Sequence, residues 1–345
     1  MTGERTVLVT GGAGFIGSRF VAHHLRACPR DRVVVLDALT YAGSLENLAG
    51  VIEGSERVQF VHGSVRSPQI VESVLAGCDA VVHFAAETHV PRSISDSAVF
   101  FETDVLGTQT LAALAVARGA RLERFVHVSS SEVYGTAVRD PMDEEHPLQP
   151  YTPYAAAKCA ADRLIYAFVQ TYALPAVTVR PFNTYGPGQH LEKLVPRFIT
   201  SALRGDPLTV HGDGRAARDW VFVDDTCAAI ERVLTAPLAA VRGEVFNVGT
   251  GVATDVLTLA HEVLRLTGAS PRLIEHAPDR PGQVQMHRAD PTRIRERLGF
   301  VPAVSLAEGL AATVEWYREH RSWWERQLWM RSVPVVGPDG AIRYW

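Results

Sequence analysis

Short apolar runs alternate with amphipathic stretches through the first half of the chain. Apolar residues recur at helical spacing in Ser18–Cys28 and Ser67–Leu75, which lie between runs rich in β-branched residues. This alternation predicts a parallel sheet built from right-handed βαβ units, because parallel neighbours need a crossover that a helix normally supplies. The runs expected to be strands are Thr6–Thr10, Arg32–Leu36, Val58–Val61, Ala80–Phe84 and Arg124–Val128.

The pattern changes after Pro181. Before it, we expect a long helix from about Tyr154 to Tyr172, followed by a strand at Ala176–Arg180. Beyond it, proline and glycine become frequent, and short strands are interspersed with helices. We therefore expect a regular domain over residues 1–180 and a smaller, irregular lobe over residues 181–345, with elements of the two interleaved.

Composition and charge narrow the class of protein. Of the 345 residues, 47% are hydrophobic and 21% are charged, which is typical of a globular protein. The net charge is -4 without a basic stripe, so nucleic acid is not expected as a partner. No apolar run approaches the ~18 residues that a membrane span needs, and no secretory leader precedes the first strand. The four cysteines are far apart, so we expect free thiols, no metal site and a cytoplasmic protein that does not bind membranes.

A glycine-rich turn separates the first expected strand from the first expected helix, in Val7-Leu-Val-Thr-Gly-Gly-Ala-Gly-Phe-Ile-Gly17. Only glycine lets a pyrophosphate come this close to the N-terminus of a helix, and the strand before and helix after it make the motif specific. We therefore expect a Rossmann-type, doubly wound α/β fold that binds a dinucleotide, with the irregular C-terminal lobe holding the substrate. The residues expected to contact the cofactor here are Gly11, Gly14, Phe15, Ile16 and Gly17.

An acidic residue, Asp37, ends the expected second strand. Its carboxylate can accept hydrogen bonds from the adenosine ribose and repels a 2′-phosphate, so NAD is favoured over NADP. Turns after the later strands are expected to face the adenine or to lie beneath the pyrophosphate. The residues placed there are Ser64, Val65, Phe84, Ala85 and Ala86.

A tyrosine and a lysine stand one helical turn apart in Tyr154-Ala-Ala-Ala-Lys158. A nearby ammonium stabilises phenolate, so we expect the pKa of Tyr154 to fall and its phenolate to accept a hydroxyl proton. Lys158 is also expected to hold the nicotinamide ribose, so both residues would contact the cofactor. A hydroxyl cluster, Ser129–Ser131, stands about 25 residues earlier. Together with the glycine-rich turn, this pattern indicates reversible oxidation of an alcohol.

That combination resembles the extended short-chain dehydrogenase/reductase family over nearly the whole chain, from Val7 to about Trp324. Within the family, the chain is similar to the dTDP-glucose 4,6-dehydratases and other nucleotide-sugar enzymes. The motifs that carry the similarity are Leu36-Asp-Ala-Leu-Thr-Tyr-Ala-Gly-Ser-Leu-Glu-Asn47, His83-Phe-Ala-Ala-Glu-Thr-His-Val90, Ser130-Ser-Glu-Val-Tyr-Gly135, Arg180-Pro-Phe-Asn-Thr-Tyr-Gly-Pro187, Glu192-Lys-Leu194 and Gly212-Asp-Gly-Arg-Ala-Ala-Arg-Asp-Trp220.

The resemblance implies a pocket for a UDP- or dTDP-linked sugar in the second lobe. Arg218 is expected to grip the diphosphate with its bidentate guanidinium, with two aspartates, Asp213 and Asp219, around it. The family also implies a homodimer through two long helices of each subunit, near Val105–Ala117 and Tyr154–Tyr172. The other residues expected in the substrate pocket are Asn183, Glu192, Lys193, Leu194, Val210, His211, Asn247, Arg280 and Arg288.

The chain departs from the dehydratases at the triplet just before Val133. By the resemblance, dehydratases have threonine, aspartate and glutamate there, whereas this chain has Ser130, Ser131 and Glu132. Ser130 can still hydrogen-bond the sugar 4-hydroxyl, and Glu132 can still remove the C5 proton. Ser131 is a poor donor in place of the aspartate that protonates the departing C6 hydroxyl, and losing a positioned acid slows a reaction on the order of 10²-fold or more. Smaller departures are Pro91 and Asp104, where dehydratases have an acid and an amide, and Ser64, where they have an aspartate.

Two reactions fit this triplet. A Ser-Ser-Glu string is similar to that of the UDP-glucuronic acid decarboxylases, in which C4 oxidation gives a β-keto acid and carbon dioxide leaves without an acid's help. We therefore expect a UDP-glucuronic acid decarboxylase that gives UDP-xylose or a UDP-4-keto-pentose. However, His287, with Arg288 beside it, stands where decarboxylases have an arginine.

The alternative is a 4,6-dehydratase of dTDP-glucose or a related sugar. The first half of the chain is more similar to the dehydratases, and some sugar dehydratases also have a serine at this place. A 4-epimerase is less expected, because epimerisation does not need Glu132. A non-catalytic dinucleotide sensor is expected to lack Tyr154 or Lys158, and the chain has both.

Overall fold

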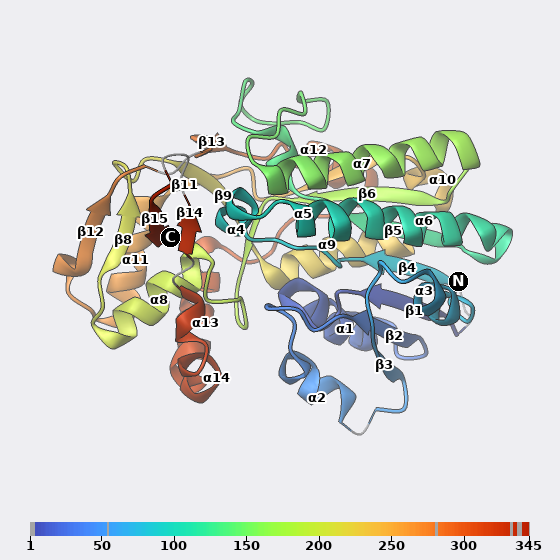
Figure 1. Ribbon diagram of the computed structural model, residues 1–345, viewed down its shortest axis with the longest axis horizontal. Helices are drawn as coiled ribbons and strands as arrows, with labels where there is room; N and C mark the ends of the chain where they lie inside the picture. Colours follow the sequence, from blue (N-terminus) through green and yellow to red (C-terminus); the bar gives the residue numbers. More distant parts are fainter. Residues whose placement is uncertain (1–3, 54, 280–281, 332–333, 337–339, 345) are drawn as a thin grey trace.

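A seven-stranded parallel sheet forms the centre of the computed structural model, which describes residues 4–53, 55–279, 282–331, 334–336 and 340–344 (Figure 1). The strand order is β10-β6-β5-β4-β1-β2-β3. The chain moves outward from β1 to β3, returns to the other side of β1 at β4, and moves outward again, which is the doubly wound topology. The strands are β1 (Thr6–Thr10), β2 (Arg32–Asp37), β3 (Val58–His62), β4 (Ala80–His83), β5 (Arg124–Val128), β6 (Ala176–Pro181) and β10 (Val245–Val248).

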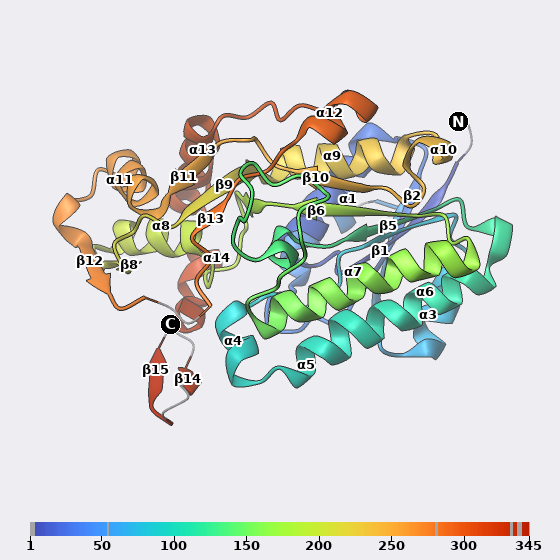
Figure 2. The same cartoon turned by 90° about the horizontal axis from the view of Figure 1, so that it is seen from above.

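Helices cover both faces of this sheet (Figure 2). On one face α1 and α9 pack side by side, and Phe20 and Ile230 contribute to the core beneath them. On the other face α3, α6 and α7 bury Val71, Leu111 and Ile165. The helices that flank the sheet are α1 (Phe15–Ala27), α3 (Pro68–Leu75), α6 (Thr108–Ala117), α7 (Pro153–Tyr172), α9 (Val223–Thr235) and α12 (Thr292–Leu298).

A second lobe lies beyond the carboxyl ends of the sheet strands (Figure 1). Its strands form short sheets in the orders β11-β9-β13 and β12-β8, with β7 also pairing with β9, and its core includes Phe198, Leu259 and Tyr317. Its elements are β7 (Asn183–Tyr185), α8 (Leu194–Arg204), β8 (Leu208–His211), β9 (Ala217–Phe222), β11 (Ala253–Asp255), α11 (Val256–Thr267), β12 (Ile274–Ala277), β13 (Met286–His287), α13 (Leu306–Glu319), α14 (Arg321–Glu325), β14 (Pro334–Val336) and β15 (Ile342–Tyr344).

Short helical segments complete the connections between these elements. They are η1 (Leu45–Leu48), α2 (Ala49–Ile52), α4 (Val90–Ser95), α5 (Ala98–Phe100), η2 (Phe101–Gly107), η3 (Gly119–Arg121), η4 (Ser131–Tyr134), α10 (Leu238–Val241), η5 (Pro271–Leu273) and η6 (Leu328–Arg331).

The Rossmann-type sheet expected from the sequence is confirmed, and the expected strands agree with the observed ones to within a residue at each end. The two parts of the chain interleave, because the edge strand β10 and the covering helices α9 and α12 all come from the segment after residue 181. The first 180 residues therefore leave the sheet without its last strand. All four cysteines are free thiols, as expected.

One helical segment among the described residues, Ala98–Ala117, is long and apolar enough to cross a membrane by length and composition, with a mean hydropathy of 1.2. The segment is made of α5, η2 and α6, and it packs along α7. Leu111, Ala112 and Ala115 are buried in the core that this face of the sheet shares with α3. This burial accounts for part of the segment's apolar character, since 39% of its apolar window is buried.

Candidate active site

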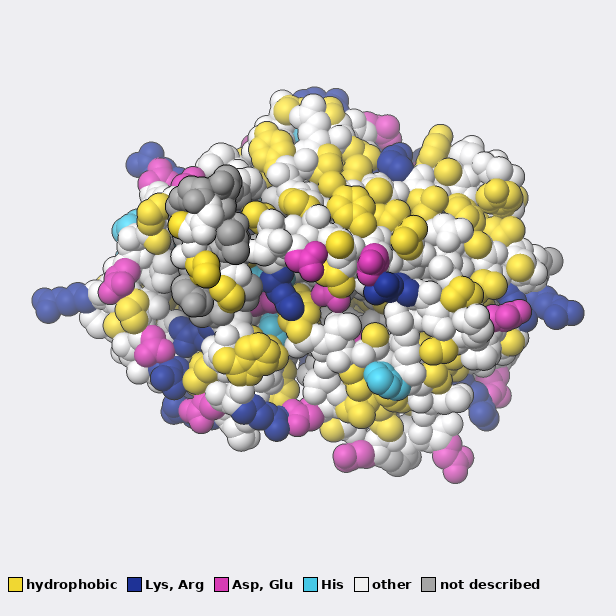
Figure 3. Space-filling model, in the orientation of Figure 1, with side chains coloured by type: hydrophobic (Ala, Val, Ile, Leu, Met, Phe, Trp, Pro, Cys, Tyr) yellow, Lys and Arg dark blue, Asp and Glu magenta, His cyan; other side chains and the backbone are white. Residues whose placement is uncertain are grey.

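A cavity of about 1350 Å³ lies between the carboxyl ends of the sheet strands and the second lobe. Its walls come from both lobes, as the topological switch point of a doubly wound sheet leads one to expect. On the face drawn in Figure 3, basic, acidic and histidine side chains gather around the groove that separates the lobes.

The glycine-rich turn forms one wall of this cavity. Gly11 has a φ of 69°, and a Cβ there would lie 2.6 Å from the Ala85 nitrogen. A Cβ on Gly17 would collide with the Gly11 carbonyl. Gly14 is the N-cap of α1 and brings no side chain to the helix N-terminus. The turn thus fits the pyrophosphate of a dinucleotide, since backbone N–H groups and the helix dipole face an open space.

The Asp37 carboxylate stabilises the glycine-rich turn by hydrogen bonds to the backbone. Its Oδ2 accepts the Ala13 N–H at 2.9 Å and its Oδ1 accepts the Leu39 N–H at 2.8 Å. Burial raises the pKa of Asp37, and these backbone hydrogen bonds oppose the rise. The carboxylate also lines the cavity, so the expected contact with an adenosine ribose stays a prediction that the geometry permits. The remaining expected cofactor residues that line the cavity are Phe15, Ile16, Ser64, Val65, Phe84, Ala85 and Ala86.

Tyr154 and Lys158 enter the cavity from the first turns of α7. Thr152 caps this helix by accepting the Ala155 N–H at 3.2 Å, and Pro153 occupies its first turn. Lys158 is buried, and its Nζ donates to the Val128 carbonyl oxygen at 2.9 Å. The sequence of Thr152 and Pro153 therefore determines where α7 begins. This start places the side chains of Tyr154 and Lys158 at the carboxyl end of β5.

The expected fall in the pKa of Tyr154 is wrong for this structure. Burial raises the pKa of Tyr154 well above its ordinary value, a hydrogen bond with Ser130 opposes the rise, and the charges of Asp104, Glu132 and Glu192 add to it. The Lys158 ammonium donates its hydrogen bond to the Val128 carbonyl oxygen and not to the phenol. Burial lowers the pKa of Lys158. Burial, with a smaller contribution from these carboxylates, thus favours the protonated form of the phenol.

The triplet Ser130, Ser131 and Glu132 lines the cavity beside Tyr154. Ser130 starts the 3₁₀ turn η4, with its Oγ accepting the Glu132 N–H at 3.2 Å. Ser131 is 3% exposed. The charge of Glu132 adds to the rise in the pKa of Tyr154, and it opposes the burial that lowers the pKa of Arg218. All three side chains line the cavity.

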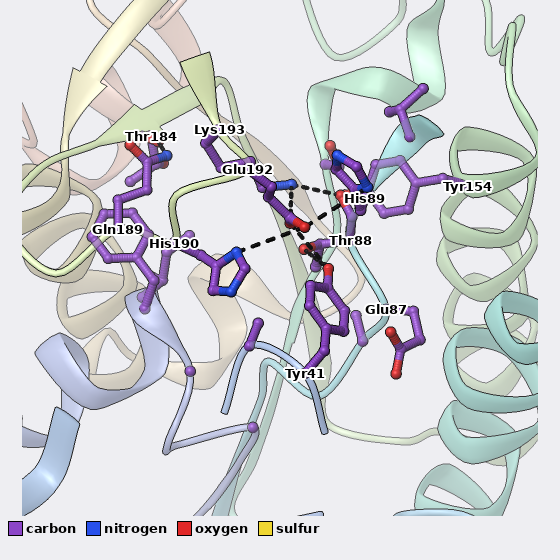
Figure 4. Close-up of a pocket in the computed structure, with 18 of the residues that line it drawn as sticks. Tyr41, Glu87, Thr88, His89, Tyr154, Thr184, Gln189, His190, Glu192 and Lys193 are labelled. Carbon is purple, nitrogen blue, oxygen red and sulfur yellow. Dashed lines mark hydrogen bonds and ion pairs between the residues drawn. The ribbon is translucent and has the colours of Figure 1, made fainter. Parts of the chain in front are cut away.

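A polar cluster around Glu192 crosses the cavity (Figure 4). The Glu192 carboxylate has 2% of its side chain exposed, accepts the Tyr41 hydroxyl at 3.0 Å and lies 3.3 Å from Lys193 Nζ. His89 and His190 approach it at 3.7 and 3.6 Å. Burial raises the pKa of Glu192, but the Lys193 and histidine charges and the Tyr41 hydrogen bond outweigh it and hold the pKa below its ordinary value.

The cluster includes residues that sequence reasoning missed. Lys193 Nζ donates to the Thr88 carbonyl at 2.7 Å, which joins the second lobe to the loop after β4. Arg92 stacks over the Tyr41 ring with its guanidinium carbon 4.0 Å from the centroid. Tyr41 and His89 stand inside the quoted motifs, so the motifs themselves held the signal. The motifs did not indicate that the segments bearing Tyr41, His89 and Lys193 meet at the Glu192 carboxylate.

Arg218 lines the cavity from β9, but its surroundings differ from those expected. Asp219 points elsewhere: its oxygens accept the N–H groups of Thr250 and Gly251, each at 2.8 Å. Asp213 accepts the Arg215 N–H in the preceding turn. Within the described part of the chain Arg218 forms no ion pair, and its guanidinium donates to the Ala217 carbonyl at 3.0 Å. The arginine is therefore available to an anionic ligand.

Three expected substrate residues lie away from the cavity, and these expectations were wrong. Val210 is fully buried in the core of the second lobe, because alternate residues of β8 point to opposite sides and His211 faces the cavity instead. Asn247 is also fully buried and accepts the Tyr134 hydroxyl at 2.7 Å. Arg288 pairs with Asp140 at 2.8 Å on the surface.

The other expected substrate residues are placed as follows. Asn183, Glu192, Lys193 and Leu194 line the cavity together with His211 and Arg218. Arg280 lies outside the described residues. His287 is fully buried beside Phe182 and does not reach the cavity wall.

A group of metal-binding residue types lies elsewhere, between α1 and α9. Ligand atoms of His24, Cys28 and Glu231 lie within 4.8 Å of one another. They already bond each other: His24 Nδ1 lies 2.8 Å from a Glu231 oxygen, and the Cys28 thiol donates to the other oxygen at 3.5 Å. Burial raises the pKa of Cys28 to about 11, which favours the protonated thiol at neutral pH.

The sequence profile of the GDP-mannose 4,6-dehydratase family matches residues 8–313, which include the central sheet and most of the residues that line the cavity. The chain belongs to this family. It is an enzyme of the nucleotide-sugar branch of the short-chain dehydrogenases/reductases, as the motifs in the sequence suggested.

Named relatives of this dehydratase family are similar along their full length. A dTDP-glucose 4,6-dehydratase of Streptomyces niveus is 45% identical over 339 residues, 97% of each chain. A solved dTDP-glucose 4,6-dehydratase of Streptomyces venezuelae, with NAD bound, is 45% identical with a TM-score of 0.88, over 93% of this chain and 99% of its own. Another from Bacillus anthracis, in complex with NAD, is 34% identical with a TM-score of 0.86, over 93% and 99%. These relatives favour the dehydratase alternative and give no support to the decarboxylase.

Proposed function

We propose that this chain is an NAD-dependent dTDP-glucose 4,6-dehydratase. The observation that carries the proposal is that Tyr154, Lys158 and Glu132 meet in one cavity of a chain 45% identical to an enzyme of that name. An epimerase needs the first two residues but not the third. Glu132 therefore supports chemistry at C5, which a 4,6-dehydratase requires.

The glycine-rich turn supports NAD as the resident cofactor. Its backbone fits a pyrophosphate, Asp37 is placed to meet an adenosine ribose, and the two solved relatives hold NAD. A nicotinamide held there would supply the hydride acceptor for oxidation at C4 and the hydride donor for reduction at C6. In this proposal residues 1–180 hold the cofactor, and residues 181–345 supply the nucleotide-sugar lobe through Asn183, Lys193 and Arg218.

The chain's own residues move the protons. Tyr154 acts as a base only as the phenolate: its own proton first passes to solvent, and the phenolate then takes the proton of the sugar 4-hydroxyl as the C4 hydride leaves, with Ser130 hydrogen-bonding that hydroxyl. The 4-ketone acidifies the neighbouring C5–H bond, and Glu132 removes that proton. The electron pair released at C5 forms a C5–C6 double bond and expels the C6 hydroxyl, which leaves as water after gaining a proton. Addition of hydride at C6 and a proton at C5 completes a 4-keto-6-deoxy sugar.

Ser131 stands where the departing C6 hydroxyl needs its proton. The side chain is 3% exposed and follows Ser130 at the start of η4. A serine hydroxyl is a weak acid, so we place Ser131, or a water hydrogen-bonded to it, as the conduit of that proton. The substitution then slows the elimination step without changing the reaction.

Charge at the sugar end of the cavity favours glucose over glucuronate. Asp104, Glu132 and Glu192 all act on Tyr154 and raise its pKa. A glucuronate would bring another carboxylate into the cavity that Glu132 and Glu192 line, with Lys193 already 3.3 Å from Glu192. A glucose C6 hydroxyl brings no charge. The electrostatics of this end therefore fit a neutral hexose.

A direct comparison of the two substrates tests the proposal. The purified chain with NAD is incubated separately with dTDP-glucose and UDP-glucuronic acid, and each mixture is followed by NMR and mass spectrometry. Loss of one water from dTDP-glucose is expected, with no change in UDP-glucuronic acid. Release of carbon dioxide from UDP-glucuronic acid, with dTDP-glucose untouched, would restore the decarboxylase.

We also propose that the chain forms a homodimer through α7 and the segment Ala98–Ala117. Hydrophobic side chains cover this face (Figure 3), in agreement with the homodimer that the family implies. The large exposed ones are Phe101 (41% exposed), Leu106 (58%), Tyr166 (49%) and Tyr172 (56%). A second copy presenting the same two helices would bury this patch in a four-helix contact.

A further inference from the structure

Asp104 lies in a π-helical turn, η2, in the middle of the helical segment that packs along α7. A π-helical turn inserts an extra residue into a helix, and such turns are frequent at functional sites. Asp104 is 1% exposed, whereas Glu102 of the same turn has 45% of its side chain exposed and pairs with Arg66 at 2.7 Å. The turn therefore carries one acid inward and one outward.

The inward carboxyl is only half satisfied. Its Oδ1 accepts the Glu87 N–H at 2.8 Å, while Oδ2 is buried without a hydrogen-bond partner. An ionised carboxylate needs partners on both oxygens when it is taken out of water. The open oxygen is the natural place for a proton. Burial accordingly raises the pKa of Asp104 to about 7, against the opposing charge of Lys158.

The titratable groups that interact with the Asp104 carboxyl come from two elements packed against it. Lys158 and Tyr154 face it from α7, and Glu87 faces it from the loop after β4. His83 of β4 does not contact the Asp104 carboxyl directly. Its Nε2 hydrogen-bonds the Thr108 hydroxyl, which donates to the backbone carbonyl oxygen of Asp104. Ionised Asp104 raises the pKa of Lys158 and also that of Tyr154.

We propose that Asp104 is a positioning residue whose protonation sets the pH range of catalysis, by changing the charge that Lys158 and Tyr154 experience. It does not line the cavity, so it acts only through these two residues. The amide that the family resemblance implies at this place has no charge to lose, so this control belongs to the chain's own sequence. The inference rests on the proposed function only in taking Tyr154 as the base.

The sign of the effect follows from the two neighbours. Removing the negative charge makes phenolate formation at Tyr154 easier, so activity that needs phenolate rises at lower pH. It also makes Lys158 give up its proton more readily, so activity that needs the ammonium falls at lower pH. Both limbs of the pH profile therefore move in the acid direction, by about one unit or more for charges this close.

The first test needs no substrate. The chain is labelled with ¹³C at the aspartate γ-carbon, and the NMR signals of the NAD-loaded protein are titrated for the native chain and for Asp104→Asn. One carboxyl signal is expected to titrate near pH 7 and to be missing from the variant. If every aspartate titrates in the ordinary acid range, the proposal is overturned, whatever the enzyme's substrate is.

The second test measures the pH dependence of dTDP-glucose turnover. Asp104→Asn keeps an oxygen for the Glu87 N–H, so a purely structural role is preserved while the charge is lost. Both limbs are expected to move to lower pH in this variant. Glu102→Gln removes the same charge from the exposed side of the same turn, and its limbs are expected to stay in place. Unmoved limbs in a folded Asp104→Asn would overturn the proposal, and failure of both chains on dTDP-glucose would count against the proposed function alone.

Discussion

At the scale of single residues, the proposed mechanism depends on the protonation state of Tyr154. Burial and three carboxylates hold the phenol neutral, and Ser130 is its hydrogen-bond partner. A positive charge brought close to the ring, such as an oxidised nicotinamide, would oppose those carboxylates. Proton transfer from the sugar is thereby tied to cofactor binding.

Replacing Tyr154 by phenylalanine tests its role as the base. We expect 4-ketone formation to fall by about 10²–10⁴-fold, because the positioned proton acceptor is lost. NAD binding should be retained, since Lys158 and the glycine-rich turn are unchanged. Stopped-flow absorbance of the reduced cofactor measures the first step, and fluorescence titration measures NAD affinity. Tyr166→Phe, which alters an exposed tyrosine on the same helix, is the matched control and should leave both unchanged. Unimpaired turnover in Tyr154→Phe would remove Tyr154 from the mechanism.

Glu132→Gln separates oxidation from elimination. The amide cannot accept the C5 proton, so we expect the reaction to stop after C4 oxidation, with the reduced cofactor accumulating in a single turnover. Quenched-flow analysis of the sugar should then recover the 4-keto hexose with its C6 hydroxyl still present. Normal release of water from this variant would mean that another group removes the C5 proton.

At the scale of elements, the strand–turn–helix at the start of the chain was predictable from local sequence. The glycines of the turn, the β-branched strand before them and the amphipathic helix after them all agree, and Asp37 closes the second strand as expected. Tyr154 and Lys158 could be found for the same reason, because a helix alone brings them together. Local agreement of this kind needs no knowledge of the tertiary fold.

The second lobe was less predictable, because its site is built from pairings between distant segments. His211 and Val210 differ only in which side of β8 they face, and a motif does not record that. The side-chain direction of Asn247 could not be predicted for the same reason. It lies on β10, the last strand of the main sheet, and accepts a hydrogen bond from the Tyr134 hydroxyl instead of lining the cavity. Glu192 was found from its motif, but its partners Tyr41 and His89 come from loops that meet only in the folded chain.

A substitution at Gly17 tests whether NAD binding requires the glycine-rich turn to lack a side chain at this position. In Gly17→Ala the new methyl meets the Gly11 carbonyl, so the turn has to shift by a strain of about 1–3 kcal/mol. We expect NAD affinity to fall about tenfold or more, measured by isothermal titration calorimetry. Gly50→Ala is the control, because a Cβ at Gly50 meets nothing within 4 Å. Equal NAD affinities in the two variants would show that the turn does not hold the pyrophosphate.

At the scale of the whole molecule, the exposed apolar face over α7 and the segment Ala98–Ala117 tests the homodimer. Leu106→Glu places a charge in the middle of the proposed contact, where Leu106 is 58% exposed. We expect light scattering to report a dimer for the native chain and a monomer for the variant. Val252→Glu, at a residue 64% exposed on the second lobe, should leave the dimer intact. A native chain that is monomeric at micromolar concentration would contradict the contact.

The cavity itself also belongs to the whole molecule, since neither lobe encloses it alone. Lys193 bridges from the second lobe to Thr88, and Arg326 of the C-terminal segment pairs with Glu46 beside the cofactor turn. Such contacts connect the two lobes across the opening of the cavity.

The most direct test of the account is the fate of dTDP-glucose in heavy water with the native chain and NAD. In the proposed mechanism Glu132 removes the C5 proton and solvent replaces it. We therefore predict a 4-keto-6-deoxy product that carries one deuterium at C5, seen by NMR as the sugar loses one water. Recovery of unchanged glucose or of its C4 epimer without deuterium at C5 would contradict the assignment of the chain as a 4,6-dehydratase.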